Sequence, residues 1–277
     1  MDFNKIFDGK VCVITGAGSG IGRALAQSLS AAGAHLALSD IDEASLAQTR
    51  GSLPASNRVM TDRLDVADAG AITSYADHVL RAMGAADYVF NVAGIARLGR
   101  FDEMPMKSFE TVMDVNFYGA VRMSKAFLGQ LKQTRGGLVN ISSIFGLIGF
   151  PGQTEYCAAK FGVRGFSEAL AIEMQPLGVS VTSVHPGGVA TNIARNAKVD
   201  AMPANGQSRD VMDAEFDKAA ITSPEEAARI ILTGTARRKR RVIVGKDAKL
   251  IQLVQRLFPE SYAKIIRRLS PNAFDIL

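Results

Sequence analysis

The sequence predicts a doubly wound α/β fold, in which a seven-stranded parallel sheet carries helices on both faces. Short apolar runs alternate with helical stretches of roughly 10–20 residues, the rhythm of repeated strand–helix units. The chain has 277 residues, of which 47% are hydrophobic and 21% are charged. This length and composition suit one large α/β core, so we expect a single domain over residues 1–277.

Seven apolar runs have the length and composition of buried strands. They cover residues 11–14, 35–38, 58–64, 88–90, 138–141, 179–184 and 241–244. A helical pattern follows the first run from about Ile21 to Ala32, with Gly33 as a plausible stop. The stretch from Gly187 to Ile221 lacks clear periodicity. We expect a mobile loop over the site there, because long loops of α/β enzymes often have that role.

Several classes of protein are excluded by what the sequence lacks. No run of 18 apolar residues occurs, so we expect no membrane-spanning helix. The first residues do not resemble a secretion signal, and two cysteines, Cys12 and Cys157, do not make a disulfide framework. We therefore expect a cytoplasmic protein. The three histidines lie far apart in the sequence without the spacing of metal ligands, so we expect no metal.

A glycine-rich segment, Thr15–Gly22, lies between the first strand and the first helix. Glycines let the backbone turn tightly and approach a pyrophosphate, and the helix N-terminus offers unpaired N–H groups and partial positive charge. Four glycines in seven residues at this place predict a dinucleotide phosphate site. The residues assigned to it are Gly16, Ser19, Gly20, Ile21 and Gly22.

Asp40 ends the second run, 18 residues after Gly22. A carboxylate at this place is suited to accept a hydrogen bond from the adenosine ribose, and it would repel a 2′-phosphate. No arginine stands beside it, since Ile41 follows. We therefore predict NAD rather than NADP as the cofactor. The alternative is that Asp40 caps the helix beginning near Asp42.

Tyr156 and Lys160 are four residues apart in a stretch predicted to be helical through Ala171. They share one face of that helix, one above the other. Tyrosine, with an ordinary pKa of about 10, is a poor base at neutral pH. A neighbouring ammonium favours the phenolate and lowers that pKa. By itself, such a pair is most often simply one face of a helix.

Taken together, the motifs resemble those of the short-chain dehydrogenase/reductase family. In chain order they are the glycine loop, Asp40, Asn91-Val92-Ala93-Gly94, Asn116, Ser142-Ser143, Tyr156-x-x-x-Lys160 and Pro186-Gly187. The resemblance covers residues from about 8 to 245 and implies a Rossmann-type fold. It implies Tyr156 as the catalytic acid/base and Lys160 as the group that lowers its pKa and holds the nicotinamide ribose. It further implies Asn116 as the support of a proton-relay water.

The resemblance also implies that Ser143 hydrogen-bonds the substrate oxygen, with Ser142 as its rival for that role. The implied cofactor contacts, besides the glycine loop, Asp40, Tyr156 and Lys160, are Asp65, Val66, Asn91, Ala93, Gly94, Pro186, Gly187, Val189 and Thr191. One position departs from the family pattern: Val92 stands where the family usually has a second asparagine. This change affects polar contacts around the central strand and removes none of the acid/base residues.

The resemblance implies an oxidoreductase that moves a hydride between NAD and the alcohol or ketone carbon of a small molecule. The apolar segment 144–151, together with residues 95–101 and the loop after Pro186, favours a hydrophobic substrate. Alternatively, Phe145 and Phe150 pack in the core or at a subunit contact. Two other functions remain open: an NADPH-dependent carbonyl reductase, and a non-catalytic dinucleotide-binding or membrane-associated protein. Family members are commonly dimers or tetramers, so we expect a homo-oligomer.

Positive charge is concentrated at the C-terminal end. Residues 229–277 hold 12 Lys/Arg and 3 Asp/Glu, whereas the rest of the chain holds 20 and 24. Residues 247–258 and 262–269 are predicted to be amphipathic helices within an extension over 246–277. We favour apolar faces that cover the substrate cleft or a neighbouring subunit. Contact with an anionic membrane is the alternative. No nucleic-acid reader motif accompanies the basic run, so we expect no nucleic-acid partner.

Overall fold

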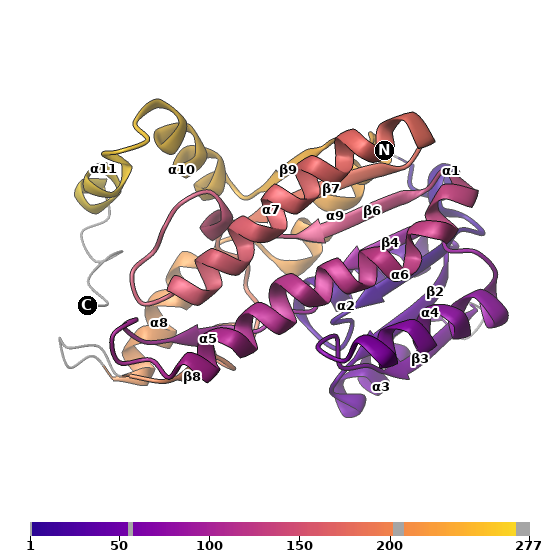
Figure 1. Cartoon of the computed structure of the whole chain (residues 1–277), viewed down its shortest axis with the longest axis horizontal. Coiled ribbons are helices and arrows are strands. Elements are labelled where there is room, and N and C mark those ends of the chain that lie inside the picture. The colour runs from indigo at the N-terminus through magenta and orange to yellow at the C-terminus, as the bar shows by residue number, and fades with distance from the viewer. Residues whose placement is uncertain (1, 55–57, 202–207, 270–277) are drawn as a thin grey trace.

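A seven-stranded parallel sheet lies at the centre of the computed structural model, which describes residues 2–54, 58–201 and 208–269 (Figure 1). The strands are β1 (Val11–Thr15), β2 (His35–Asp40), β3 (Val59–Arg63), β4 (Tyr88–Asn91), β6 (Gly137–Ile141), β7 (Ser180–Pro186) and β9 (Arg241–Val244). Their order across the sheet is β3-β2-β1-β4-β6-β7-β9. Each strand coincides with one of the seven apolar runs, so the predicted sheet is confirmed.

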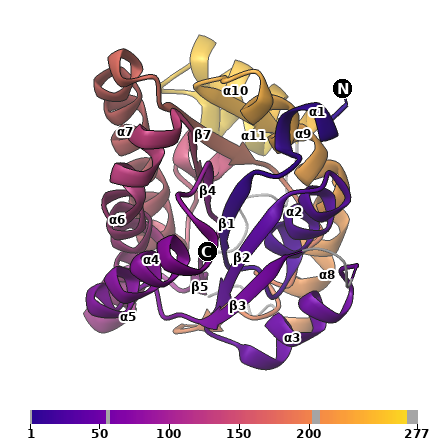
Figure 2. The ribbon, with the colours of Figure 1, turned by 90° about the vertical axis from the view of Figure 1, so that its right-hand side faces the viewer.

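Alternate residues of the strands face two separate hydrophobic layers. Val11 and Val13 of β1 pack in one cluster, whereas Cys12 and Ile14 pack in the other, because successive side chains of a strand point to opposite faces. The cluster that contains Val11 and Val13 includes residues of α4 (Ala69–Met83), α6 (Gly119–Thr134) and α7 (Thr154–Met174). The cluster that contains Cys12 and Ile14 includes residues of α2 (Gly20–Ala31), α3 (Glu43–Gly51) and α9 (Pro224–Ala236). Figure 2 shows these two sets on opposite sides of the sheet, as a doubly wound fold requires.

The carboxyl ends of the parallel strands meet at one edge of the sheet. β1 pairs with β2 on one side and with β4 on the other, so the strand order reverses between β1 and β4. A ligand crevice in an open α/β sheet lies at such a reversal, outside the carboxyl ends of the strands. Thr15, Asp40 and Asn91 end three neighbouring strands at this edge.

The stretch from Gly187 to Ile221 is more regular than the predicted loop. β8 (Lys198–Val199) pairs in parallel with β5 (Arg97–Leu98), and α8 (Arg209–Ala219) is a helix; residues 202–207 lie outside the described part. The loop prediction is therefore wrong for 209–219. The α8 sequence is mostly polar. Arg209 pairs with Asp213 one turn further along the helix and donates to the carbonyl of Ala197 outside it. The sequence of this segment lacks the periodic spacing of apolar residues that would predict a helix.

The C-terminal end folds into a helical hairpin of α10 (Lys246–Leu257) and α11 (Tyr262–Leu269), at the two positions predicted (Figure 1). Its inner face is buried through Ala248 and Ile266 against the loop that links β6 to α7. The Gly149 N–H donates to the Tyr262 hydroxyl over 3.0 Å. The hairpin thus covers part of segment 144–151, one of the segments predicted to form a wall of the substrate site. Of the helices in the described ranges, none has both the length and the apolar character to cross a membrane.

Candidate active site and cofactor cleft

The glycine loop packs tightly between β1 and α2. Gly16 has φ of 64°, and a Cβ on it would lie 2.8 Å from the Ala93 backbone nitrogen. A Cβ on Gly22 would overlap the Gly16 carbonyl oxygen. Only glycine fits both places, because one needs a positive φ and the other has no space. A Cβ on Gly20 would touch the Thr191 side chain, so the segment after β7 lies against this loop.

The N-terminus of α2 is open to an anion. Its N-cap residue, Ser19, makes no side-chain cap, and the first turn, which contains Ile21, carries no acidic residue. By contrast, Asp42 and Asp68 cap α3 and α4 with their own carboxylates. The first backbone N–H groups of a helix have no intrahelical partner. In α2 they remain for an anionic ligand such as a pyrophosphate.

Asp40 stands at the end of β2 against the glycine loop. Its Oδ2 accepts from the Gly18 N–H over 2.8 Å, and its Oδ1 accepts from the Asp42 N–H over 3.1 Å. The residue that caps α3 is Asp42, which accepts from the N–H groups of Ala44 and Ser45. The helix-cap alternative for Asp40 is therefore wrong. The Asp40 carboxylate instead lies at the edge of the cleft, beside the predicted phosphate site.

The Asn91 side chain points into a buried polar network. Its Nδ2 donates to Asn140 Oδ1 over 2.8 Å, and Asn140 Nδ2 donates to Ser167 Oγ over 2.9 Å. These bonds join β4, β6 and α7. The N–H groups of Val92 and Ala93 both donate to Thr15 Oγ1 over 3.1 Å. Because the backbone makes these contacts, valine in place of the family's second asparagine leaves this loop anchored.

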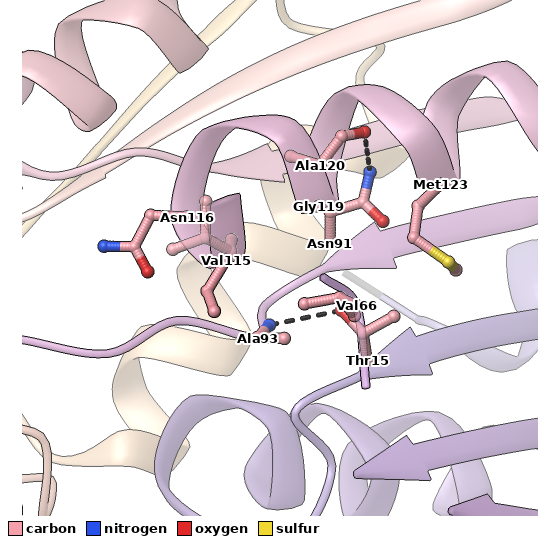
Figure 3. Close-up of a pocket in the computed structure, with 10 residues that line it drawn as sticks. Thr15, Val66, Asn91, Ala93, Val115, Asn116, Gly119, Ala120 and Met123 are labelled. Carbon is pink, nitrogen blue, oxygen red and sulfur yellow. Dashed lines mark hydrogen bonds between the residues drawn. The ribbon is translucent and has the colours of Figure 1, made fainter. Parts of the chain in front are cut away.

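A small cavity opens where β1 and β4 end against the start of α6 (Figure 3). Its lining includes Thr15, Val66, Asn91, Ala93, Asn116 and Gly119. Four of these were predicted from the sequence, and Val66, Asn91 and Ala93 among them were predicted to contact the cofactor. Asp65 shapes the turn that presents Val66, since its Oδ1 accepts from the Ala67 N–H over 2.9 Å.

Asn116 lies in a π-helical turn, η1 (Asp114–Tyr118), between α5 (Met106–Met113) and α6. Such turns are rare and are frequent at functional sites. Its Oδ1 accepts from the Ile95 N–H and its Nδ2 donates to the Ile95 carbonyl, each over 2.8 Å. A Cβ on Gly94 would lie 3.2 Å from Asn116 Oδ1 and 3.5 Å from Lys160 Nζ. Asn116 therefore holds the loop after β4 against Lys160.

Tyr156 and Lys160 occupy the first two turns of α7 and are both buried. Lys160 Nζ donates to the Ile141 carbonyl over 3.0 Å and lies 5.4 Å from the centroid of the Tyr156 ring. Burial lowers the pKa of Lys160 to about 8. Burial also raises the pKa of Tyr156 to about 12, against a smaller lowering from its hydrogen bond with Ser143.

The pKa of Tyr156 thus differs from the predicted lowering. The side chain is shielded from water, and desolvation penalises the phenolate; this effect outweighs the favourable contacts within the protein. At neutral pH, Tyr156 is a protonated phenol and Lys160 keeps its positive charge. The resting pair is an acid ready to donate a proton.

The two adjacent serines point in different directions. The buried Ser142 hydroxyl donates to the Lys160 carbonyl over 2.7 Å, so it secures α7. Ser143 lies close enough to Tyr156 to lower its pKa, and its Oγ accepts from the Phe145 N–H over 3.1 Å. Of the two candidates, Ser143 lies beside the tyrosine.

Pro186 ends β7, and the segment after it reaches the glycine loop through Thr191. The Gly187 N–H donates to the Val244 carbonyl over 2.9 Å. The Gly188 N–H donates to Asp247 Oδ2 over 2.7 Å, which ties this segment to α10. Val189 is buried and forms an isolated bridge with Thr222.

His185 is a residue that the sequence analysis overlooked. It is fully buried, with Nδ1 3.0 Å from the Ser143 carbonyl oxygen and Nε2 3.0 Å from Ser183 Oγ. Burial lowers the pKa of His185 to about 4, so the ring is neutral at physiological pH. Because a carbonyl can only accept, Nδ1 carries the hydrogen and Nε2 accepts from the serine. The imidazole therefore fixes the backbone of Ser143.

Apolar side chains surround the Tyr156 ring. Phe145 meets it edge-on, with centroids 6.3 Å apart and planes at 86°, and stacks on Phe150 with centroids 4.6 Å apart. Ile95 and Ile193 belong to the same cluster. All three segments predicted as walls therefore contribute to one apolar environment. The two phenylalanines also pack on each other, so the packing alternative for them holds as well.

An ion pair joins the segment after β4 to the segment after β7. The Arg97 guanidinium binds the Asp200 carboxylate through two nitrogens, and Ser108 donates to the same carboxylate over 2.9 Å. Glu155, fully buried, precedes Tyr156 next to this pair. Burial raises the pKa of Glu155 to about 7, and repulsion from Asp200 adds to the rise. Within the described ranges, no cluster of three or more His, Cys, Asp or Glu could hold a metal ion.

We expect Glu155→Gln to stabilise the protein at high pH. An acid whose folded-state pKa lies above its unfolded value loses stability as pH rises from about 4.5 to about 7. Glutamine has the same shape without this penalty. The free energy of unfolding should rise by about 1–3 kcal/mol at pH 8, with a smaller gain at pH 5.

Urea denaturation at both pH values measures this difference. The exposed Glu173, on the same helix, supplies the matched control Glu173→Gln, which should change little at either pH. A gain that is equal at pH 5 and pH 8 would show that Glu155 is already ionised in the folded protein.

Comparison with known proteins agrees with this geometry. A family model described as short chain dehydrogenase matches residues 10–201. A protein of Mycobacterium tuberculosis (strain ATCC 25618 / H37Rv), named as the oxidoreductase SadH, is 47% identical over 267 residues, 94% of this chain and 95% of that protein. A crystal structure of a short-chain dehydrogenase/reductase from Burkholderia phymatum in complex with NAD aligns with a TM-score of 0.83 at 28% identity, covering 92% of this chain and 95% of that one.

A second similar structure is the alcohol dehydrogenase of the archaeon Thermococcus sibiricus, complexed with 5-hydroxy-NADP. It aligns with a TM-score of 0.73 at 26% identity, covering 85% of this chain and 95% of that chain. The family model spans six of the seven strands of the Rossmann-type sheet, all except β9. This chain therefore belongs to the short-chain dehydrogenase/reductase family and is an oxidoreductase with a fold that takes a nicotinamide cofactor.

Proposed function

We propose that this protein uses NAD(H) to interconvert a secondary alcohol and a ketone on a hydrophobic small molecule, with Tyr156 as the acid/base. The observation that carries the proposal is the meeting of Tyr156, Lys160 and Ser143 at the carboxyl edge of the sheet, beside the loop after β4 that packs on the glycine loop. An acid, a cation and a hydroxyl within one apolar pocket can serve a reacting carbonyl oxygen.

Two features of the cleft support binding of a dinucleotide. The open N-terminus of α2 suits the pyrophosphate, and Asp40 suits the hydroxyls of the adenosine ribose. Val66 and the loop after β4 would lie along the adenine side, and the segment after Pro186 would lie along the nicotinamide. When bound, the nicotinamide supplies or accepts the hydride, and the protein sets its orientation.

In the reducing direction, Tyr156 Oη donates its proton to the substrate oxygen as the carbonyl carbon receives the hydride. Ser143 hydrogen-bonds the same oxygen and stabilises its developing charge. Lys160 places its positive charge near the resulting phenolate, which then recovers a proton from solvent. In oxidation the phenolate takes the alcohol proton, and the steps reverse. Because the Asn116 side chain is occupied by Ile95, its support of a relay water would come from its backbone.

The proposed substrate is apolar next to the reacting carbon. Phe145, Ile95 and Ile193 surround the Tyr156 ring, and apolar walls favour a substrate that loses water on entry. The NADPH-dependent reductase is the second candidate, since one similar structure holds a 5-hydroxy-NADP ligand. A homodimer or homotetramer and a cytoplasmic location stay predictions from the sequence.

We expect Tyr156→Phe to lower kcat by about 10²–10⁴-fold, the range typical of losing a general acid. Binding of NAD should change little, because the phenyl ring keeps its packing. The measurement is the absorbance of NADH at 340 nm with a panel of secondary alcohols, sterols and hydroxyacyl compounds, alongside calorimetric titration with NAD. Tyr118→Phe, at an exposed tyrosine, is the matched control. Equal turnover in Tyr156→Phe and the parent would exclude the tyrosine mechanism.

We expect His185→Leu to lower kcat by about 10–100-fold with little change in NAD affinity. Loss of the bond to the Ser143 carbonyl lets the catalytic hydroxyl shift, and small displacements of this kind are costly. His185→Asn should restore most of the activity, since its Nδ2 can occupy the place of Nδ1. If the leucine and asparagine variants are equally impaired, His185 acts only through packing.

We expect the parent enzyme to prefer NAD over NADP in kcat/KM. Asp40→Asn should reduce that preference by at least about tenfold, because it removes the charge that repels a 2′-phosphate while keeping the side chain's size. Asp42→Asn, at the α3 cap, removes a neighbouring carboxylate but keeps the charge of Asp40, so it should leave the ratio unchanged. A parent enzyme that prefers NADPH would instead favour the reductase.

A further inference from the structure

The outer face of α10 carries an exposed apolar stripe. Leu250, Leu253 and Leu257 are spaced so that they share one side of the helix, and their exposed fractions are 54%, 53% and 61%. Phe258, also exposed, extends the stripe beyond the end of the helix. The opposite side of the hairpin, through Ala248 and Ile266, is already buried against the rest of the protein. The stripe is therefore a second apolar surface with no use in the fold.

The hairpin that bears this stripe is rich in cations. The exposed basic residues of the hairpin are Lys246, Lys249, Arg256, Lys264, Arg267 and Arg268. None of the six pairs with an acidic side chain in the described part of the chain. Of the two acidic residues between 246 and 269, Asp247 turns inward to the Gly188 N–H. Glu260 alone offsets the six outward charges.

We propose that the α10–α11 hairpin docks the protein on an anionic lipid surface, with Leu250, Leu253 and Leu257 entering the headgroup region. An exposed leucine stripe bordered by lysine and arginine is the pattern of a helix that lies in a membrane interface. The apolar residues bury area among the lipids, and the cations are attracted to their negative headgroups.

The charge distribution favours lipid over a second copy of this chain. A symmetric contact through the stripe would place the same six cations of each copy against each other, and like charges at a contact are unfavourable. The rest of the chain, residues 1–228, holds 20 basic and 24 acidic residues. Residues 246–269 hold six basic and two acidic residues, so the hairpin has a net positive charge that an anionic surface would attract.

Docking in this orientation would bring the site close to the lipid. The hairpin covers the loop that bears Phe145, which touches the Tyr156 ring. An apolar substrate dissolved in the bilayer could then enter without crossing water. This consequence rests on the proposed function, whereas docking itself does not.

The first test is co-sedimentation of the full-length protein with vesicles at low salt. Vesicles of equal parts phosphatidylglycerol and phosphatidylcholine should bind the parent at least tenfold more tightly than phosphatidylcholine alone. The triple variant Leu250→Ser/Leu253→Ser/Leu257→Ser and the pair Lys249→Glu/Arg256→Glu should each lose at least tenfold. Circular dichroism and NAD binding check that the variants remain folded.

A fluorescence probe locates the contact. The chain has no tryptophan, so Leu253→Trp introduces a single reporter, and Leu80→Trp places the same reporter at an exposed leucine of α4. Anionic vesicles should shift the emission to the blue only in Leu253→Trp. An unchanged spectrum in both variants overturns the proposal, as does binding that survives the triple serine variant.

A contact between two copies of this chain would give a different experimental result. If the parent ignores vesicles and the triple serine variant lowers its mass in sedimentation equilibrium, the stripe is a contact between copies and the proposal fails. Because vesicle binding is measured without turnover, its failure leaves the proposed reaction untouched, and an inactive enzyme that still binds vesicles leaves the docking intact.

Discussion

The buried polar contact between β6 and α7 is the constraint on which the site depends. Lys160 donates to the Ile141 carbonyl, Ser142 donates to the Lys160 carbonyl, and Asn140 donates to Ser167 two turns further along the helix. In a low-dielectric core, unmade hydrogen bonds of this kind are costly. They therefore fix both the rotation of α7 and its position along the strand. Tyr156 meets Ser143 only because that register is fixed.

Other parts of the chain hold the cleft in shape mainly through the backbone. Asn116 binds both polar backbone groups of Ile95, His185 binds the Ser143 carbonyl, and Thr15 binds two successive N–H groups after β4. Because these bonds are made to the backbone, the side chain at the bonded residue can change. Val92 can therefore replace an asparagine while the loop after β4 stays anchored to Thr15. They also place the reacting groups on rigid elements instead of on free loops.

The C-terminal hairpin connects the site to the surface. Asp247 binds the Gly188 N–H beside the cleft, and Tyr262 binds the Gly149 N–H in the apolar loop. One face of the hairpin is consequently part of the structure around Tyr156, and the other carries the basic and apolar stripe. The leucine stripe and Asp247 are both on α10, so a partner bound to the stripe would contact the helix that also supports the cleft. The Arg97–Asp200 pair closes the opposite side, joining two segments that are 103 residues apart.

The sequence by itself determined the seven strands, the glycine loop and the Tyr156–Lys160 pair, because periodicity and short motifs record local geometry. It also placed both C-terminal helices. Tertiary structure alone decided that Asp40 binds the glycine loop, that Asn91 faces the buried network and that Arg209 ties α8 to Ala197, since these depend on partners distant in the chain. The same holds for His185 and Glu155, and for the raised pKa of Tyr156. Burial is a property of the assembled core, and no spacing in the sequence encodes it.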